Sequence, residues 1–294
     1  MSAKVRVLEF LQDNTKNKPN EDALCVSESK AVFAVADGVT QFVEKGGTYP
    51  ELPTAAVVAR AFCFYAVGSM SKSIEEVLNE SRAIYAREII SAFRVANSKI
   101  AGFNGGLGAD YFENDLAGCV GVLGVLDGAE SGSPILHYGY IGDCGLFVFD
   151  KDLHPVFLSD NNNIGPLEQF REGTPFSDKR AGAVFWRRDL RNHPDARYLT
   201  YGVLTGEEEA LSYVKTGSVS LEAGDTAILF SDGILPFIFC EEFRTALRIQ
   251  LHSGSKSVEQ VRNTISALTK KLSKRHILNL DDDKAFVAFS IQEL

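Results

Sequence analysis

The 294-residue sequence lacks several features that would each point to a particular class of protein. Its five cysteines form no CxxC pair and are odd in number, which favours free thiols in a reducing compartment over a disulfide framework. Its five histidines show no zinc-ligand spacing. The longest apolar run, residues 55–70, is interrupted by Arg60 and is too short to span a bilayer, and residues 1–6 resemble no signal peptide. The sequence therefore predicts a cytoplasmic protein.

Positive charge is also scarce, because 30 Lys and Arg face 39 Asp and Glu, for a net charge of −9. A nucleic-acid-binding surface needs a basic patch or stripe, so we expect neither a nucleic-acid nor a membrane partner. The hydrophobic content of 45% is ordinary for a globular protein. With no linker or repeat in the sequence, we predict a single domain over residues 1–294. The oligomeric state stays open.

The pattern of apolar residues predicts an α+β fold. Strands are expected at about 5–10, 23–26, 31–36, 119–126, 135–141, 146–149, 219–221, 227–231 and 285–289. Helices are expected over 54–67, ended by Gly68, over 73–100 after a capping box at 73–76, and from Ser257 to Leu272. Runs of strands with grouped helices, without strict alternation, favour helices that cover antiparallel sheets.

Residues 151–213 carry a weaker pattern, with several prolines and a group of basic residues. These are Lys179, Arg180, Arg187, Arg188, Arg191 and Arg197. We interpret the segment as an irregular basic insertion beside the functional site, and not as a separate domain. The basic group either orients an acidic or phosphorylated substrate or is a solvated loop, and the sequence does not decide between the two.

Four predicted strands meet an acidic residue at one end. Asp37 follows the run 31–36, Asp232 follows 227–231, residues 281–283 precede the last strand, and Glu21 and Asp22 precede 23–26. Each signal alone is weak, since Asp-Gly is a common turn and three aspartates usually form a solvated loop. A carboxylate at the end of a buried strand nevertheless needs a positive partner. Oxygen ligands suit Mg²⁺ or Mn²⁺, and two such ions can activate a water for attack on phosphorus.

With these motifs in view, nearly the whole chain resembles the protein phosphatase 2C (PPM) family of metal-dependent Ser/Thr phosphatases. The motifs that carry the resemblance occur in family order: 20–23 (NEDA), 33–38 (FAVADG), 140–145 (YIGDCG), 199–202 (LTYG), 229–233 (LFSDG) and 282–287 (DDKAFV). The resemblance implies a four-layer α-β-β-α sandwich, in which two antiparallel sheets are flanked by helix pairs and the metals lie at one end.

The resemblance also implies a role for individual residues. Asp37 would bridge two Mg²⁺ or Mn²⁺ ions, and Asp232 and Asp282 would complete the first. Glu21 and the Gly38 carbonyl would hold the second ion, and Asp22 would hydrogen-bond the metal-bound waters, so that Asp22 and Asp37 are the expected catalytic pair. Asp143 occupies a position that helps to hold a third ion in some members.

The chain departs from the family around the phosphate. An arginine usually lies four residues before the glutamate, where this chain has Asn17 between Lys16 and Lys18. Lysine lacks the bidentate fork of arginine, so these three residues form a possible but altered phosphate site. Pro236 replaces an acid that usually helps to bind the third ion.

These observations favour phosphomonoester hydrolysis by a hydroxide that bridges two divalent ions, on phosphoserine or phosphothreonine of a protein. Two alternatives remain. The missing arginine is compatible with a hydrolase of a small phosphorylated metabolite. Asn17, together with Val39 and Thr40 in place of the family's glycine pair after Asp-Gly, is compatible with a weak catalyst that binds a phosphoprotein or another partner.

Overall fold

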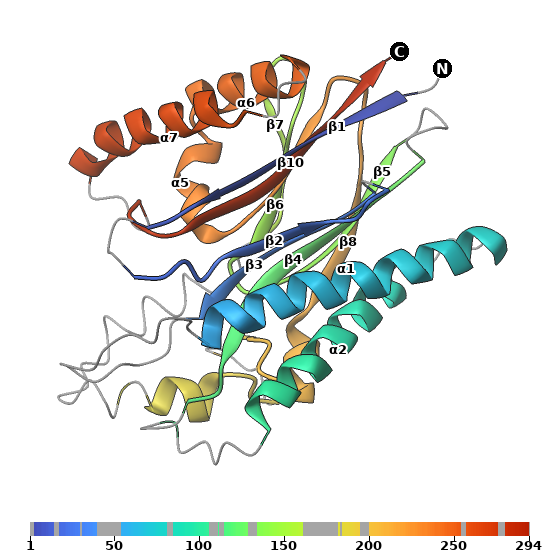
Figure 1. Cartoon of the computed structure of the whole chain (residues 1–294), viewed down its shortest axis with the longest axis vertical. Helices are drawn as coiled ribbons and strands as arrows, with labels where there is room; N and C mark the ends of the chain where they lie inside the picture. The colour runs from blue at the N-terminus through green and yellow to red at the C-terminus, as the bar shows by residue number, and fades with distance from the viewer. Residues whose placement is uncertain are drawn as a thin grey trace.

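The computed structural model describes residues 3–14, 18–29, 31–39, 54–80, 85–105, 111, 115–128, 134–160, 182, 184–194, 200–253, 257–275 and 280–293. Two five-stranded antiparallel sheets form its centre (Figure 1). The first sheet has the strand order β1 (Ala3–Gln12), β10 (Lys284–Glu293), β9 (Thr226–Phe230), β6 (Gly145–Phe149) and β7 (Pro155–Leu158). The second has the order β2 (Ala23–Val26), β3 (Val32–Val39), β4 (Gly118–Asp127), β5 (Ile135–Ile141) and β8 (Lys215–Ser220).

Helix pairs cover the outer face of each sheet (Figure 1). Helices α1 (Thr54–Glu80) and α2 (Tyr85–Asn104) pack on the β2-to-β8 sheet, and α6 (Glu241–Ser253) and α7 (Glu259–Leu272) pack on the other. Shorter helical segments are η1 (Trp186–Leu190), η2 (Glu208–Tyr213), η3 (Asp232–Ile234), α5 (Leu235–Ile238) and η4 (Ser273–Arg275). The four-layer α-β-β-α sandwich expected from the sequence is confirmed.

The core forms three apolar layers. One lies between the sheets, where the rings of Phe33 and Phe289 stack with centroids 4.6 Å apart, and one lies under each helix pair. The central strands β3, β4, β9 and β10 are apolar on both faces because each of them separates two of these layers. This double burial makes the polar ends of the same strands conspicuous in the sequence.

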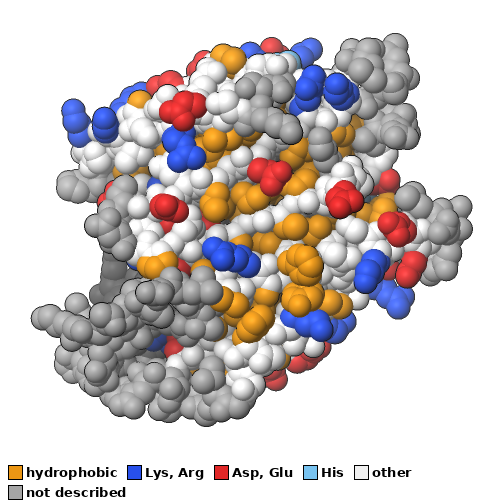
Figure 2. All heavy atoms as spheres, viewed as in Figure 1, with side chains coloured by type: hydrophobic (Ala, Val, Ile, Leu, Met, Phe, Trp, Pro, Cys, Tyr) orange, Lys and Arg blue, Asp and Glu red, His pale blue; other side chains and the backbone are white. Residues whose placement is uncertain are grey.

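One side of the sandwich exposes both sheet edges. Strands β1 and β2 are the terminal strands of their sheets, and their side chains Val5, Val7, Leu24 and Val26 are only partly buried against the inter-sheet core. Figure 2 shows a band of hydrophobic side chains across the middle of this view, between the two helix pairs, with basic and acidic side chains scattered around it. Among the described residues, no helix combines the length and the apolar character needed to cross a bilayer.

The prediction that Gly68 ends the first helix was wrong, because α1 continues to Glu80. Gly68 is exposed, while Val67 and Met70 beside it are buried in the core under the helix pair. This burial outweighs the cost of about 1 kcal/mol for one glycine in a helix. The predicted capping box therefore lies inside α1, where the Ser73 hydroxyl donates to the Ser69 carbonyl at 3.2 Å.

The turn at Gly142 and Asp143 carries the chain from β5 in one sheet to β6 in the other. Two other features differ from what the sequence predicted. The predicted irregular insertion contains β7, which pairs with β6 at the sheet edge. Helix α6 was missed. Its apolar residues recur at helical spacing, with Phe243, Leu247 and Leu251 on one buried face.

Replacing Gly68 by alanine should stabilise the protein by about 0.5–1 kcal/mol, since the residue is helical and a methyl group there meets nothing within 4 Å. Urea unfolding would measure the change. Gly121→Ala is the matched control, because its Cβ would lie 2.5 Å from the Phe62 ring, and it should lower the free energy of unfolding. A destabilising Gly68→Ala would contradict the continuous helix.

Candidate metal centre

Strand register brings the first pair of acids together. In the β2–β3 ladder Ala23 lies opposite Ala36, so Asp22 and Asp37 sit next to each other just beyond this pair. In the other sheet the Ser231 amide donates to the Ala285 carbonyl at 3.0 Å, which sets Asp232 beside the acidic turn at 281–283. The Ser231 hydroxyl donates to the Asp22 carboxylate at 2.7 Å and thereby joins the two sheets. Acids from four strand ends converge at one end of the sandwich.

The Asp37 and Asp232 carboxyl groups at the centre lie within hydrogen-bonding contact of each other. Burial raises the pKa of both, and repulsion from neighbouring carboxylates adds to it, so that the pKa of Asp232 reaches about 7. Burial likewise raises the pKa of Asp22 and of Asp143, the latter with a contribution from Asp282. The predicted third-metal residue therefore belongs to the same group of acids.

The second predicted ligand, Glu21, is buried and paired with a lysine. The Lys18 ammonium lies 3.1 Å from a Glu21 carboxylate oxygen, 3.3 Å from Asp282 and 3.8 Å from Asp283. Burial opposes the charge of Lys18, but these carboxylates outweigh it and raise the pKa of the lysine. One ammonium group therefore contacts two of the residues expected to bind metal.

Asp283 is a structural acid that the sequence did not reveal as such. It is buried, and one of its oxygens accepts hydrogen bonds from the Asn14 amide at 2.7 Å and the Asn14 side chain at 2.6 Å. Its other oxygen accepts from the Glu21 amide at 3.0 Å. Asp283 thus fixes the connection between β1 and β2, and with it the position of Glu21. An acidic turn gives no sequence signal that separates this residue from its solvated neighbour Asp281.

Lys284 was quoted in a motif but given no role by the sequence. Its side chain is fully buried, and its ammonium donates to the carbonyls of Leu280 at 2.9 Å and Asp282 at 2.7 Å. Burial lowers the pKa of Lys284, and the surrounding carboxylates oppose this shift. The lysine holds the turn that carries Asp282. The sequence did contain one signal of this role, which is a lysine directly before an apolar strand.

Gly38 lies where α1 approaches the strand most closely. A Cβ at this position would lie 2.8 Å from the Ala55 carbonyl and 2.8 Å from the Glu21 carbonyl oxygen. The Gly38 amide also donates to the Glu21 carbonyl at 3.1 Å. Only glycine fits here, so the backbone of the predicted ligand pair Glu21 and Gly38 is held in fixed contact.

The donor set fits divalent ions by its chemistry, because oxygen atoms from Glu21, Asp37, Asp232 and Asp282 gather in a buried region that repels further negative charge. Among the described residues, no three His, Cys, Asp or Glu side chains are already arranged around a common point as metal ligands. Instead Asp37 and Asp232 lie in hydrogen-bonding contact, and the Lys18 ammonium pairs with both Glu21 and Asp282. The lysine supplies part of the positive charge that a bound metal ion would supply.

The basic residues do not form an open phosphate site in the part of the chain that the structure describes. Lys16, Asn17, Lys179, Arg180 and Arg197 lie outside the described residues. Arg187 and Arg191 both pair with Asp115, at 2.7 and 3.2 Å, and Arg188 pairs with Asp189 at 2.9 Å. These three arginines therefore form ion pairs within the protein. Arg187 and Arg191 fit neither of the two roles expected for the basic group, substrate binding or a solvated loop.

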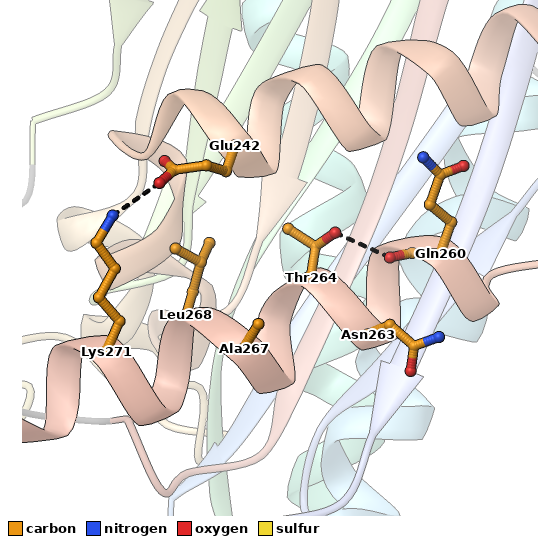
Figure 3. A pocket seen from close by; sticks show the side chains of 7 residues that line it. All are labelled: Glu242, Gln260, Asn263, Thr264, Ala267, Leu268 and Lys271. Carbon is orange, nitrogen blue, oxygen red and sulfur yellow. Dashed lines mark hydrogen bonds and ion pairs between the residues drawn. The ribbon is translucent and has the colours of Figure 1, made fainter.

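A surface hollow of about 650 Å³ lies elsewhere, on the outer helix pair (Figure 3). Residues of α6 and α7 line it, and the ion pair between Lys271 and Glu242, at 2.7 Å, lies at one end (Figure 3). Its lining side chains are mostly small or uncharged and include none of the acids described above. The convergent acids, and not the hollow, are the candidate functional site.

Comparison with solved structures agrees with the fold. The chain is similar to the serine/threonine phosphatase PstP/Ppp of Mycobacterium tuberculosis, with a TM-score of 0.60 and 17% identity over 98% of this chain and 99% of that one. A second structure of the PstP catalytic domain, in complex with two manganese ions, has a TM-score of 0.58 at 17% identity, over 99% of this chain and 100% of that one. The PPM Ser-Thr phosphatase MsPP of Mycobacterium smegmatis has a TM-score of 0.51 at 17% identity, over 99% of this chain and 98% of that one.

The sequence itself matches no family model and no curated protein. At identities below 20%, structural likeness establishes the fold and leaves the activity to be argued from the site. The chain has the fold of the PPM-type serine/threonine phosphatases, as the sequence motifs predicted.

The raised pKa values predict how stability depends on pH when no metal is bound. The folded protein keeps protons that the unfolded chain releases above about pH 4, so stability should fall as the pH rises toward 7. In a chelator, urea unfolding at pH 5 and pH 7.5 would measure this loss. Asp232→Asn should reduce the slope, and the exposed control Asp152→Asn should not. An unchanged slope of stability against pH in Asp232→Asn would contradict the raised pKa of Asp232.

Removing the buried ammonium of Lys284 should destabilise the acidic turn. Lys284→Met keeps the apolar stem but leaves two carbonyls without their donor, which should cost about 1–3 kcal/mol of unfolding free energy. Lys271→Met, which removes an exposed ion pair with Glu242, is the control and should change stability by less than about 0.5 kcal/mol. Equal losses in both variants would refute the structural role of Lys284.

Proposed function

We propose that this protein is a metal-dependent phosphomonoester hydrolase that acts on phosphoserine or phosphothreonine of proteins with two Mg²⁺ or Mn²⁺ ions. The observation that carries the proposal is the convergence of Asp22, Asp37 and Asp232 from both sheets, linked by the bonds from Ser231 to Asp22 and from Asp37 to Asp232. A structural purpose alone does not require several buried carboxylates at one point, because their mutual repulsion destabilises the fold. The likeness to a phosphatase structure that holds two manganese ions supports the assignment.

The residues take roles that follow from their positions. Asp37 would bridge both ions, Asp232 and Asp282 would complete the first, and Glu21 with the Gly38 carbonyl would hold the second. Asp143, which repels Asp37 and Asp232 electrostatically, would contribute to a third ion. When bound, the two ions would supply Lewis acidity and lower the pKa of water near the phosphorus. Asp22, held by the Ser231 hydroxyl, would accept a hydrogen bond from that water and orient it.

The substrate phosphate requires positive charge that the acids do not supply. Lys18 lies at the edge of the acid group, on the connection that also contains Lys16 and Asn17. We assign phosphate binding to this connection. Lysine acts as a point charge, so it neutralises the phosphate without the bidentate geometry of arginine.

We also place the protein in a reducing compartment, the cytoplasm. All five cysteines, Cys25, Cys63, Cys119, Cys144 and Cys240, are free thiols. Free buried thiols persist where glutathione and thioredoxin keep them reduced.

Hydrolysis of p-nitrophenyl phosphate by the purified protein tests the reaction. We expect turnover with Mn²⁺ or Mg²⁺, none with EDTA, and a loss of roughly a hundredfold or more in Asp37→Asn, because the bridging carboxylate is lost. Asp152→Asn, which changes an exposed acid in the turn between β6 and β7, should retain full activity. Metal binding without any turnover would overturn the hydrolase and favour a partner-binding protein.

The same preparation separates the classes of substrate. We expect phosphoserine and phosphothreonine peptides to be hydrolysed with a higher kcat/KM than sugar phosphates or free phosphoamino acids. The reverse order would show that a small phosphorylated metabolite is the substrate.

A further inference from the structure

Lys18 occupies a position that the proposed function requires for metal. Its ammonium is 3.1 Å from Glu21 and 3.3 Å from Asp282, and these two carboxylates are assigned to different ions. The Lys18 side chain is 19% exposed and Glu21 is 1% exposed. Burial of a carboxylate such as Glu21 is costly without positive charge nearby, so the Lys18 ammonium stabilises the acids in their present positions.

We propose that Lys18 is an internal cation that must leave Glu21 and Asp282 before divalent ions bind, so that metal loading releases its ammonium group toward solvent and substrate. The inference rests on the proposed function, since it takes Glu21 and Asp282 as metal ligands. The inference adds a step to the proposed function. Metal binding exchanges one cation for another, and Lys18 reaches its phosphate-binding position only after this exchange.

Geometry makes the two cations exclusive. A divalent ion lies about 2.0–2.6 Å from each carboxylate oxygen, which is closer than the ammonium nitrogen lies now. An ion bound to the same oxygens would therefore fall within contact distance of the lysine. Two positive charges at that distance repel each other strongly in a buried region. The lysine side chain has to move.

The amide and the carbonyl of Lys18 are anchored, so the movement is confined to its side chain. The Asn14 side chain donates to the Lys18 carbonyl at 3.0 Å and accepts from the Lys18 amide at 3.4 Å. Asn14 in turn is held by Asp283. Rotation about the four-carbon stem carries the ammonium away from the acids while its attachment point stays beside the site. Release therefore leaves the charge close to where a phosphate would bind.

The first test measures the accessibility of the amine in the wild-type protein. Pulse acetylation by a water-soluble N-hydroxysuccinimide ester, followed by peptide mass spectrometry, is run in EDTA and in saturating Mn²⁺. We expect Lys18 to react about tenfold faster with Mn²⁺, the change that corresponds to the loss of one charged hydrogen bond. Lys215, which is exposed on β8, is the internal control and should react equally in both. An unchanged Lys18 rate with Mn²⁺ bound would overturn the proposal.

The second test measures the competition directly by calorimetric titration with Mn²⁺. Lys18→Met should bind Mn²⁺ about tenfold more tightly, because no ion pair has to break, and Lys18→Arg should remain near wild type. Lys4→Met, which removes the same charge from an exposed residue at the opposite end of β1 from the acidic turn, controls for net charge. Affinity in Lys18→Met equal to or weaker than wild type would overturn the proposal.

Thermal unfolding gives a signature that a nearby but uninvolved lysine would not produce. In EDTA, Lys18→Met should unfold at a lower temperature than wild type, since Glu21 loses its partner. In saturating Mn²⁺ the difference should disappear. A deficit that persists with Mn²⁺ would show that Lys18 stays with the acids and would overturn the exchange. A metal-loaded protein without phosphatase activity would refute the proposed function and leave all three of these measurements informative.

Discussion

Burial of several carboxylates at one point governs this structure, because each added negative charge must be matched by a proton, an ammonium group or a metal. The structure meets this constraint in three different ways within one small region. The raised pKa values of Asp37 and Asp232 favour bound protons, Lys18 joins Glu21 to Asp282, and the buried Lys284 supports the backbone of the acidic turn. Each solution places positive charge beside the acids without removing them, which keeps the oxygen atoms available to a stronger cation.

The sandwich supplies the rigidity that this charge pattern needs. Neither sheet alone contains the full set of acids, since Asp37 lies near the end of β3 in one sheet and Asp232 follows β9 of the other. The inter-sheet layer, with Phe33 stacked on Phe289, fixes the distance between these strand ends. The Ser231 hydroxyl, which bonds to Asp22 and accepts from the Ala285 amide, ties the sheets together at the site itself. Packing energy therefore offsets electrostatic repulsion.

Sequence reasoning found the strands, the fold class and the acids, because buried strands that end in Asp leave a local pattern. It failed wherever the deciding contact lies far away in the chain. The bond from the Glu21 amide to Asp283 spans 262 residues, so nothing near residue 283 distinguishes a buried acid from a solvated one. Helix α1 was cut at Gly68 because propensity is local, whereas the burial of Val67 and Met70 that keeps the helix intact is tertiary. Whether the assigned acids bind metal stays a prediction.

The pairing of β1 with β10 affects the order in which the protein folds during its synthesis. Ala3 pairs with Glu293 and Gln12 with Lys284, so β1 is completed by a strand that lies far along the chain. During synthesis β1 has no partner on this side until β10 emerges, and the turn with Asp282 and Asp283 is translated just before β10. The Glu21 amide, for example, meets Asp283 only after the 262-residue separation between them has been synthesised. A nascent chain can build the β2-to-β8 sheet early, but its acid group assembles as one of the last events of folding.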